Sequence, residues 1–322
     1  MARSRVQTDN PEQVAALLKQ GDERTLARVL TLVENRAEGH ERILDAAYTG
    51  VGRAWRIGLT GPPGAGKSTL AARIIEHLLS TGSQVAYLGV DPSSPFSGGA
   101  LLGDRIRLSQ PEGGRFFARS LATRGAQGGL SEQTEASVDL LDSAGFDVVI
   151  IESAGVGQAE IDISRVVDTV VVVLAPESGD EIQAMKAGIL EVGDVLCVNK
   201  SDRANADALV AALRSSLAMR FGRTQEWQPA IVTSTALPGG SVHALIEQIQ
   251  LHRTFLGESG RWVDIRRDRL KRCIETLVTR RWLNRFWTPE RLEILETVLD
   301  TIDDTMPRPY ALAERLTSSK LE

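Results

Sequence analysis

The chain has 322 residues, of which 42% are hydrophobic, so it is long enough to bury the core of an α/β domain and to carry flanking segments. Its net charge of −5 excludes a general attraction to nucleic acid or to an anionic membrane surface, so small anions must be recognised locally. The first residues lack the apolar core of a signal peptide, and no stretch approaches the ~20 apolar residues of a membrane span. We therefore expect a cytoplasmic protein, with an organellar matrix as the alternative compartment.

Three kinds of segment follow one another along the chain. From Pro11 to about Tyr48 the apolar residues recur at three- and four-residue spacing, which predicts two amphipathic helices. After a glycine-containing break, short apolar runs alternate with helical stretches, and beyond about Phe255 only helical periodicity remains. The expected domains are an N-terminal helical extension at residues 1–50, an α/β domain at residues 51–253 and a C-terminal helical arm at residues 254–322.

The middle segment contains six predicted strands. Each is a short apolar run, and a helical stretch separates most of them from the next. This alternation is typical of a mostly parallel sheet that is covered by helices. The predicted strands are Trp55–Thr60, Val85–Val90, Asp147–Ile151, Val170–Leu174, Val195–Val198 and Ala230–Val232.

A phosphate-binding motif lies directly after the first predicted strand. The segment GPPGAGKS fits G-x-x-x-x-G-K-[ST], and a helical stretch follows it. Its glycines let successive backbone N–H groups surround a phosphate at a helix N-terminus, where the helix dipole also favours anions. Lys67 is expected to reach the β- and γ-phosphates, and Ser68 to ligate Mg²⁺. The alternative is a Gly/Pro-rich turn with a chance lysine, and the flanking strand and helix argue against it. The predicted phosphate-binding residues are Gly61, Pro62, Pro63, Gly64, Ala65, Gly66, Lys67, Ser68 and Thr69.

Three acidic residues are candidates for the magnesium site, because Mg²⁺ prefers hard oxygen ligands. Asp91 ends one predicted strand, and Asp104 lies in a glycine-flanked loop beyond it; the alternative for both is a helix cap or a turn. Glu152 ends another strand and stands three residues before Gly155, an arrangement that ties metal and γ-phosphate to one mobile loop. Gln158 follows and is a candidate for orienting the attacking water, with a surface glutamine as the alternative.

A base-recognition motif, NKSD, directly follows the predicted apolar strand VLCV. Guanine offers two adjacent donors that the carboxylate of Asp202 can accept together, whereas adenine cannot satisfy this aspartate. Asn199 can bind guanine N7 and brace the loop, and the stem of Lys200 can lie over the purine ring. The turn at Thr235 and Ala236 can offer a backbone N–H to guanine O6. These residues predict GTP and GDP as the ligands.

Longer segments resemble the MeaB/ArgK/MMAA family of P-loop GTPases. They are VDPSSPFSGGALLGDRIRL, ESAGVGQAEID and GDEIQAMKAGILEVGDVLCVNKSD, and the close resemblance covers about residues 50–253. It implies a doubly wound sheet with an N-terminal helical extension and a C-terminal helical dimerisation arm, and therefore a homodimer. It also implies a chaperone that gates adenosylcobalamin delivery to an acyl-CoA mutase and protects that enzyme. Methylmalonyl-CoA mutase or a mutase for a related branched or hydroxylated acyl-CoA is the expected partner.

The resemblance also assigns individual residues. It gives phosphate and magnesium roles to Lys67, Ser68, Asp91, Asp104 and Glu152, and the base role to Asn199, Lys200 and Asp202. A mobile segment that responds to the mutase matches Gly179, Asp180, Glu181, Gln183 and Lys186. Lys186 is the candidate for a catalytic group that the partner moves into place, with a solvated helix lysine as the alternative. The loop after Glu152 departs from the usual family sequence at Ser153, Ala154 and Ala159, which keeps a mutase with a different substrate open as an alternative.

Two other functions compete with a regulatory GTPase. The first is a P-loop kinase that transfers the γ-phosphate to a small molecule or a protein, although a kinase has no evident use for a guanine-reading loop. The second is a nucleotide-locked scaffold that scarcely hydrolyses GTP. Hydrolysis in a single turnover, with and without candidate acceptors, separates the three.

Overall fold

The computed structural model divides into two compact units, the first ending at Val263 and the second beginning at Asp264. Among the residues that it describes, no helix is long and apolar enough to cross a membrane. The domain limits expected after residues 50 and 253 stay predictions. The described residues are 10–91, 114–122, 132–155, 159–176, 188–220, 227–235, 242–300 and 306–318.

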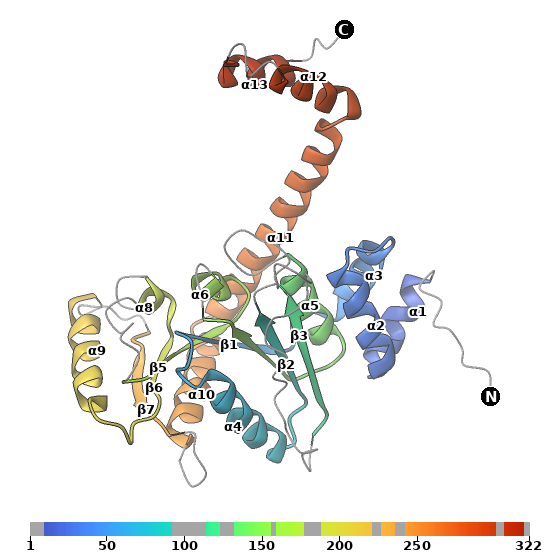
Figure 1. Ribbon diagram of the computed structural model, residues 1–322. Helices are drawn as coiled ribbons and strands as arrows, with labels where there is room; N and C mark the ends of the chain where they lie inside the picture. The colour runs from blue at the N-terminus through green and yellow to red at the C-terminus, as the bar shows by residue number, and fades with distance from the viewer. Residues whose placement is uncertain are drawn as a thin grey trace. The chain divides into compact units, whose positions relative to one another are not determined.

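A seven-stranded sheet in the order β3-β2-β4-β1-β5-β6-β7 forms the centre of the first unit (Figure 1). Every neighbouring pair is parallel. Parallel sheets are covered on both faces, and the strands β1, β5 and β6 are accordingly buried along their whole length. The α/β class predicted from the sequence is confirmed. The strands are β1 (Trp55–Thr60), β2 (Val85–Asp91), β3 (Phe116–Ala122), β4 (Val148–Ser153), β5 (Thr169–Leu174), β6 (Val195–Val198) and β7 (Ala230–Thr233).

Strand β3 was not among the six predicted strands. It lies at the end of the sheet order and pairs with β2. Its sequence, FFARSLA, contains no continuous apolar run, and Leu121 is its one fully buried residue in the described part of the strand. A half-exposed edge strand needs fewer apolar residues than a central one, which is why hydrophobic runs alone did not reveal it.

Helices cover both faces of the sheet, as a doubly wound fold requires. In β4, Val148 and Ile150 pack on one face, while Val149 and Ile151 pack on the other. This alternation divides the hydrophobic core into two layers. The first face is covered by α4 (Lys67–Ser80) and α10 (His243–Glu258). The second face is covered by α5 (Glu132–Ser143), η2 (Ile163–Arg165), α8 (Ile189–Val192) and α9 (Ala206–Arg220), and α6 (Ala159–Asp162) leads into η2.

The N-terminal segment forms three helices, whereas the sequence pattern predicted two. Asp22 caps the second of them, because its Oδ1 accepts a hydrogen bond from the backbone N–H of Thr25 at 2.6 Å. Gly39, with φ of 81°, begins the third, which is only eight residues long. The spacing of apolar residues did not separate the short third helix from the second, so the predicted number of helices was wrong. The helices are α1 (Pro11–Lys19), α2 (Glu23–Glu34) and α3 (His40–Ala47), followed by the 3₁₀ turn η1 (Tyr48–Gly50).

Arg119 of β3 connects the N-terminal helices to the edge strand of the sheet. Its guanidinium donates to the backbone oxygen of Ala27 at 3.0 Å and to Thr31 Oγ1 at 3.1 Å. It also pairs with the carboxylate of Glu34 at 2.7 Å. All three partners belong to α2, so Arg119 ties this helix to the edge strand, and α2 packs in the same core layer as α5.

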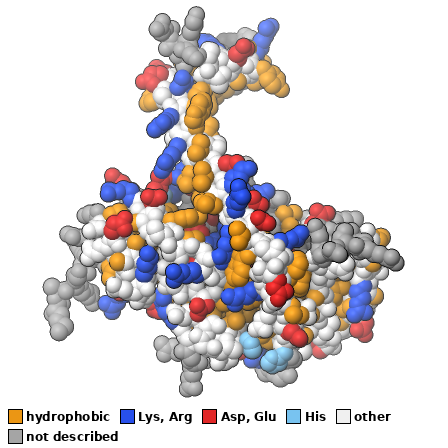
Figure 2. Space-filling model, turned by 180° about the vertical axis from the view of Figure 1, so that it is seen from behind, with side chains coloured by type: hydrophobic (Ala, Val, Ile, Leu, Met, Phe, Trp, Pro, Cys, Tyr) orange, Lys and Arg blue, Asp and Glu red, His pale blue; other side chains and the backbone are white. Residues whose placement is uncertain are grey.

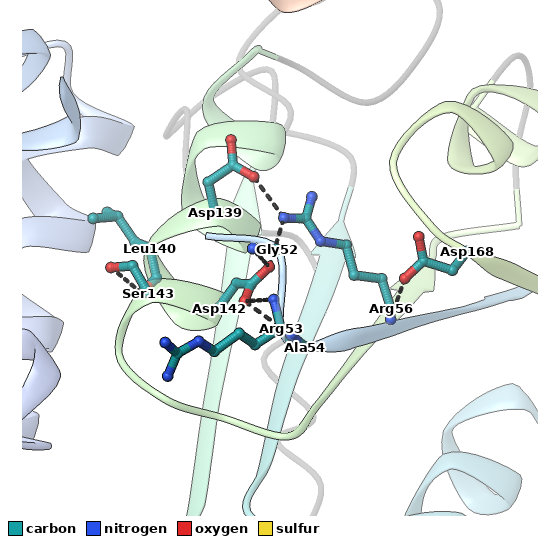
Figure 3. A network of polar contacts seen from close by, with 9 residues as sticks. All are labelled: Gly52, Arg53, Ala54, Arg56, Asp139, Leu140, Asp142, Ser143 and Asp168. Atoms are coloured by element: carbon teal, nitrogen blue, oxygen red, sulfur yellow. Dashed lines mark hydrogen bonds and ion pairs between the residues drawn. The ribbon is translucent and has the colours of Figure 1, made fainter. Parts of the chain in front are cut away.

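A buried charge network joins β1 to its neighbours at the amino-terminal edge of the sheet (Figure 3). Arg56 is 2% exposed and pairs with Asp139 at 2.7 Å and with Asp142 at 3.0 Å. Burial alone would lower the pKa of Arg56, but the two carboxylates outweigh it, so the pKa is raised and the guanidinium stays charged. Asp142 also accepts from the backbone N–H groups of residues 52–54 at 2.8 to 3.0 Å. Asp168 accepts from the backbone N–H of Arg56 at 2.9 Å.

The second unit is helical, as the sequence predicts. Thr288 caps its second helix, accepting from the backbone N–H of Arg291 at 3.4 Å, and Pro289 occupies the first helical position. The helices are α11 (Arg261–Phe286), which begins in the first unit, α12 (Pro289–Leu299) and α13 (Pro309–Thr317).

Replacing Asp142 by alanine should strongly destabilise the first unit. The change leaves Arg56 with one carboxylate fewer and removes the acceptor of three backbone N–H groups, a loss on the order of 3–5 kcal/mol in the free energy of unfolding. Urea unfolding measures it. Asp45→Ala, at an exposed position of α3, is the matched control and should change the free energy by less than about 0.5 kcal/mol. Equal effects of the two substitutions would contradict the assigned role of the network.

Candidate nucleotide-binding site

The predicted phosphate loop connects β1 to α4. Its last residue before the helix, Gly66, has φ of 92° and occupies the N-cap position of α4 without a side-chain cap. A Cβ at Gly66 would collide with the side-chain amide of Asn199, and one at Gly61 would collide with the backbone oxygen of Val173. The loop therefore needs glycine at both positions, and the N–H groups of the first turn of α4 lack helical acceptors, as an anion site requires.

Lys67 is the first residue of α4 and is 6% exposed. Its Nζ donates to the backbone oxygens of Gly61 at 2.8 Å and Pro62 at 3.0 Å, so the amine is held against the loop. The loop after β4 approaches the same amine. Gly155 has φ of 78°, and a Cβ there would collide with Gly61 and with the Lys67 amine. Gly155, the candidate contact of the γ-phosphate, therefore lies beside the phosphate loop.

Two hydroxyl groups and a carboxylate meet at Glu152, and one of the hydroxyls belongs to Ser68, the residue after Lys67. The Ser68 hydroxyl donates to Glu152 Oε1 at 2.6 Å, and the Tyr87 hydroxyl donates to Glu152 Oε2 at 2.7 Å. Asp91 ends the neighbouring strand, and its side chain lies outside the described part of the structure. A hydroxyl and a carboxylate at one strand edge suit the hard-oxygen preference of Mg²⁺. The described residues contain no group of three His, Cys, Asp or Glu side chains that could hold a metal ion.

The predicted base loop follows β6 and is tied to the phosphate loop. Asn199 Nδ2 donates to the backbone oxygen of Ala65 at 2.8 Å, and its Oδ1 accepts from Ser234 Oγ at 3.3 Å. The backbone oxygen of Ser234 accepts from the N–H of Ser201 at 3.1 Å. Lys200 has φ of 55°, which turns the chain so that the exposed Asp202 follows within the same loop.

The structure thus brings the described members of the predicted site to one edge of the sheet. Pro63, Gly64 and Thr69 are exposed on or beside the phosphate loop, and Thr235 follows β7. The roles of these residues stay predictions. The predicted residues Asp104, Gln158, Lys186 and Ala236 lie outside the described residues, as does the segment Gly179–Gln183.

Two residues of this edge were not predicted. Tyr87 touches Glu152, and Ser234 touches both Asn199 and, through its hydroxyl, the Cys197 sulfur at 3.2 Å. A tyrosine in the otherwise apolar run VAYLGV and a serine directly before the predicted turn are the signals that the sequence offered. Neither signal identifies a partner, because the partners come from other strands.

A family model described as "Methylmalonyl Co-A mutase-associated GTPase MeaB" matches residues 26–291. The chain belongs to this family. The resemblance predicted from the sequence is therefore confirmed, and with it the class of P-loop GTPases.

Individual relatives agree with this membership. A protein of Pyrococcus abyssi named as a GTPase is 41% identical over 271 residues, covering 83% of this chain and 84% of the relative. The GTPase ArgK of Escherichia coli is 37% identical over 257 residues, covering 77% of this chain and 78% of ArgK. A crystal structure of a LAO/AO transport system kinase matches with a TM-score of 0.72 and 28% identity over 98% of both chains.

Replacing Gly66 by alanine should weaken the binding of GDP and GTP by about tenfold or more, because the new Cβ displaces the Asn199 amide that joins the two loops. Gly82→Ala is the matched control, since Gly82 also has a positive φ, of 85°, but a Cβ there meets nothing within 4 Å. Both variants carry the backbone strain, and only the first disturbs Asn199. Titration calorimetry measures the affinities. Equal losses in the two variants would show that strain alone, and not the Asn199 contact, is responsible.

Proposed function

We propose that this chain binds GTP and GDP with Mg²⁺, hydrolyses GTP slowly, and uses the bound nucleotide to control adenosylcobalamin delivery to an acyl-CoA mutase. One observation carries the nucleotide part of the proposal. The hydrogen bond from Asn199 Nδ2 to the backbone oxygen of Ala65 joins the base loop to the phosphate loop, so both face the same edge of the sheet. That edge is where open α/β sheets bind their ligands.

The phosphates would lie on the N–H groups at the start of α4, with the Lys67 amine beside them. Ser68 and Glu152, which already share a hydrogen bond of 2.6 Å, would hold Mg²⁺ together with Asp91 and Asp104. When bound, the ion neutralises charge on the phosphates and on the leaving group. Gly155 would contact the γ-phosphate, since its backbone lies against Lys67 and Gly61. Gln158 would orient the attacking water.

Guanine would be selected by the loop after β6. The exposed carboxylate of Asp202 would accept from the two adjacent donors of the base, while Asn199 and Lys200 would contact its other edge and its face. The backbone around Thr235 and Ala236 would donate to guanine O6. Because Asn199 is hydrogen-bonded to Ala65 and Ser234, its side chain would need little rearrangement to contact the base.

The mutase part rests on the family description, which names methylmalonyl-CoA mutase. We expect the chain to hydrolyse GTP slowly when its partner is absent. A group supplied by a partner accelerates P-loop GTPases by ~10³–10⁵, so the mutase could complete the site. Lys186 is the residue we expect the partner to move. Single-turnover hydrolysis of GTP, with and without a purified acyl-CoA mutase, tests this part. Stimulation supports the proposal, and an unchanged rate with methylmalonyl-CoA mutase and with hydroxyacyl- and other branched-acyl-CoA mutases contradicts it.

The alternative of a P-loop kinase has one observation in its favour, the likeness of this chain to the LAO/AO transport system kinase. A kinase requires an acceptor for the γ-phosphate. Release of free phosphate from labelled GTP, without label on an added amino acid or protein, excludes this alternative.

The helical arm would join two copies of the chain. Along α11, Leu270, Ile274, Val278 and Trp282 follow one another at four-residue spacing and are 41%, 51%, 57% and 67% exposed. They form an apolar row on one side of the helix, visible as orange side chains in Figure 2. An exposed row of this length typically packs against a partner, and a second copy offers a matching row by symmetry.

Asp202→Asn should weaken GTP binding and shift preference toward XTP. Xanthine presents a carbonyl where guanine presents its amine, so the new amide can donate to it. Loss of the charge-assisted pair should cost on the order of 1.5–3 kcal/mol of GTP affinity. Calorimetry with GTP, XTP and ATP measures the change, and Asp207→Asn, an exposed aspartate at the start of α9, is the control. An unchanged GTP affinity would remove Asp202 from the base site.

Ile274→Glu should convert a dimer into a monomer, because a charge in the centre of the apolar row opposes its burial. Light scattering after size exclusion gives the mass. Thr276→Glu lies on the opposite side of α11 and is exposed, so it should leave the dimer intact. A monomeric parent chain, or a dimer that survives Ile274→Glu, would refute the assignment of this row to self-association.

A further inference from the structure

A tyrosine inside the sheet reaches the candidate metal site. Tyr87 lies in the middle of β2, and Gly89 follows it on the same face two residues later. Gly89 pairs in register with Glu152 of β4, so these three residues share the face that α4 covers. The tyrosine side chain therefore runs along its own strand, past Gly89, toward the carboxylate at the strand end.

Both oxygens of that carboxylate have a donor. Oε1 of Glu152 accepts from Ser68 at 2.6 Å, and Oε2 accepts from the Tyr87 hydroxyl at 2.7 Å. Tyr87 is 7% exposed, and its ring is packed with the core residues beneath α4. A buried phenol needs a hydrogen-bond partner, and a packed ring holds its hydroxyl in one place. The tyrosine is therefore a fixed donor, whereas Ser68 is on the exposed side of the carboxylate.

Gly89 supplies the space that the tyrosine needs. A Cβ at this position would lie 3.3 Å from the Tyr87 hydroxyl oxygen and 3.5 Å from the ring carbon Cε1. The first distance is tight, so the hydroxyl that holds Glu152 would have to shift by a few tenths of an ångström. The second is an ordinary van der Waals contact. A methyl group at residue 89 is thus unfavourable only while the hydroxyl is present.

We propose that Tyr87 is a positioning residue of the magnesium site, and this proposal rests on the proposed function. Its hydroxyl fixes the plane of the Glu152 carboxylate, so that Oε1 stays turned toward Ser68. With the hydroxyl removed, the carboxylate rotates about its last torsion, and Ser68 loses a reliable acceptor. Partners that orient ligands in this way typically change metal affinity by about 10–100-fold when they are removed. Tyr87 does not touch the nucleotide in this assignment, so the binding of metal-free GDP is unaffected.

The test measures how strongly Mg²⁺ slows the release of a fluorescent GDP analogue from the full chain. In the parent protein, release should be slow with Mg²⁺ and fast with a chelator. Tyr87→Phe keeps the packed ring and should raise the Mg²⁺ concentration for half-maximal slowing by about tenfold or more, with the release rate in chelator unchanged. Tyr310→Phe removes the hydroxyl of a tyrosine in α13 that is 91% exposed, and this variant should behave as the parent does.

Gly89→Ala provides an independent test of the same hydroxyl. In the parent background its Cβ displaces the hydroxyl, so it should raise the Mg²⁺ requirement as Tyr87→Phe does. In the Tyr87→Phe background it should have no further effect, because the close atom is gone. The two substitutions are therefore strongly non-additive if the hydroxyl is the shared cause. Additive effects of the two changes would overturn the proposal.

Glu152→Gln separates this inference from the proposed function. If Glu152→Gln abolishes the Mg²⁺ effect while Tyr87→Phe leaves it intact, the positioning role is wrong and the proposed magnesium site stands. If the parent chain binds the GDP analogue without any response to Mg²⁺, the proposed magnesium site is wrong as well. Thermal unfolding of each variant shows that the fold is kept, and a Tyr87→Phe variant that unfolds only a few degrees lower still decides the question through its release rates.

Discussion

All seven strands run in the same direction, and this constraint decides where everything else lies. Parallel strands place their carboxyl ends at one edge of the sheet and their amino ends at the other. Segments far apart in the sequence therefore meet at the carboxyl edge, among them the phosphate loop after β1, Glu152 at the end of β4 and Asn199 after β6. The phosphate loop follows β1, which lies in the centre of the order between β4 and β5.

The amino edge has the opposite task, because its strands begin there with N–H groups that need acceptors. Aspartates supply them. Asp142 accepts from the N–H groups of residues 52–54, Asp147 from Gln84 at 2.8 Å, and Asp194 from Val170 at 2.7 Å. Arg56 lies buried at the same edge, where it forms ion pairs with two carboxylates. The aspartates thus fix the starts of the strands at the amino edge, and the loops of the candidate nucleotide site lie at the carboxyl edge.

The sequence predicted those features that lie in one continuous segment. Buried strands such as β1 are apolar runs, and the phosphate and base motifs keep their spacing within a few residues, so they were recognisable from their order along the chain without the folded sheet. Strand β3 was missed because an edge strand that carries Arg119 and Ser120 has no such run. The contact of Tyr87 with Glu152 depends on the pairing of β2 with β4, which only the folded sheet provides. The hydrogen bond from Ser234 to Asn199 was missed for the same reason.

The two halves of the site are held in different ways, and this difference bears on regulation. The base loop is fixed by Asn199, whose amide is bonded to a backbone oxygen and to a serine that is itself buried. The proposed metal side depends on side-chain contacts, since Glu152 is partly exposed and accepts hydrogen bonds from Ser68 and Tyr87. Side-chain contacts rearrange at lower cost than a braced backbone turn. Under the proposed function, a partner that acts on the loop after Glu152 would change the metal and γ-phosphate contacts and leave the choice of base unaltered.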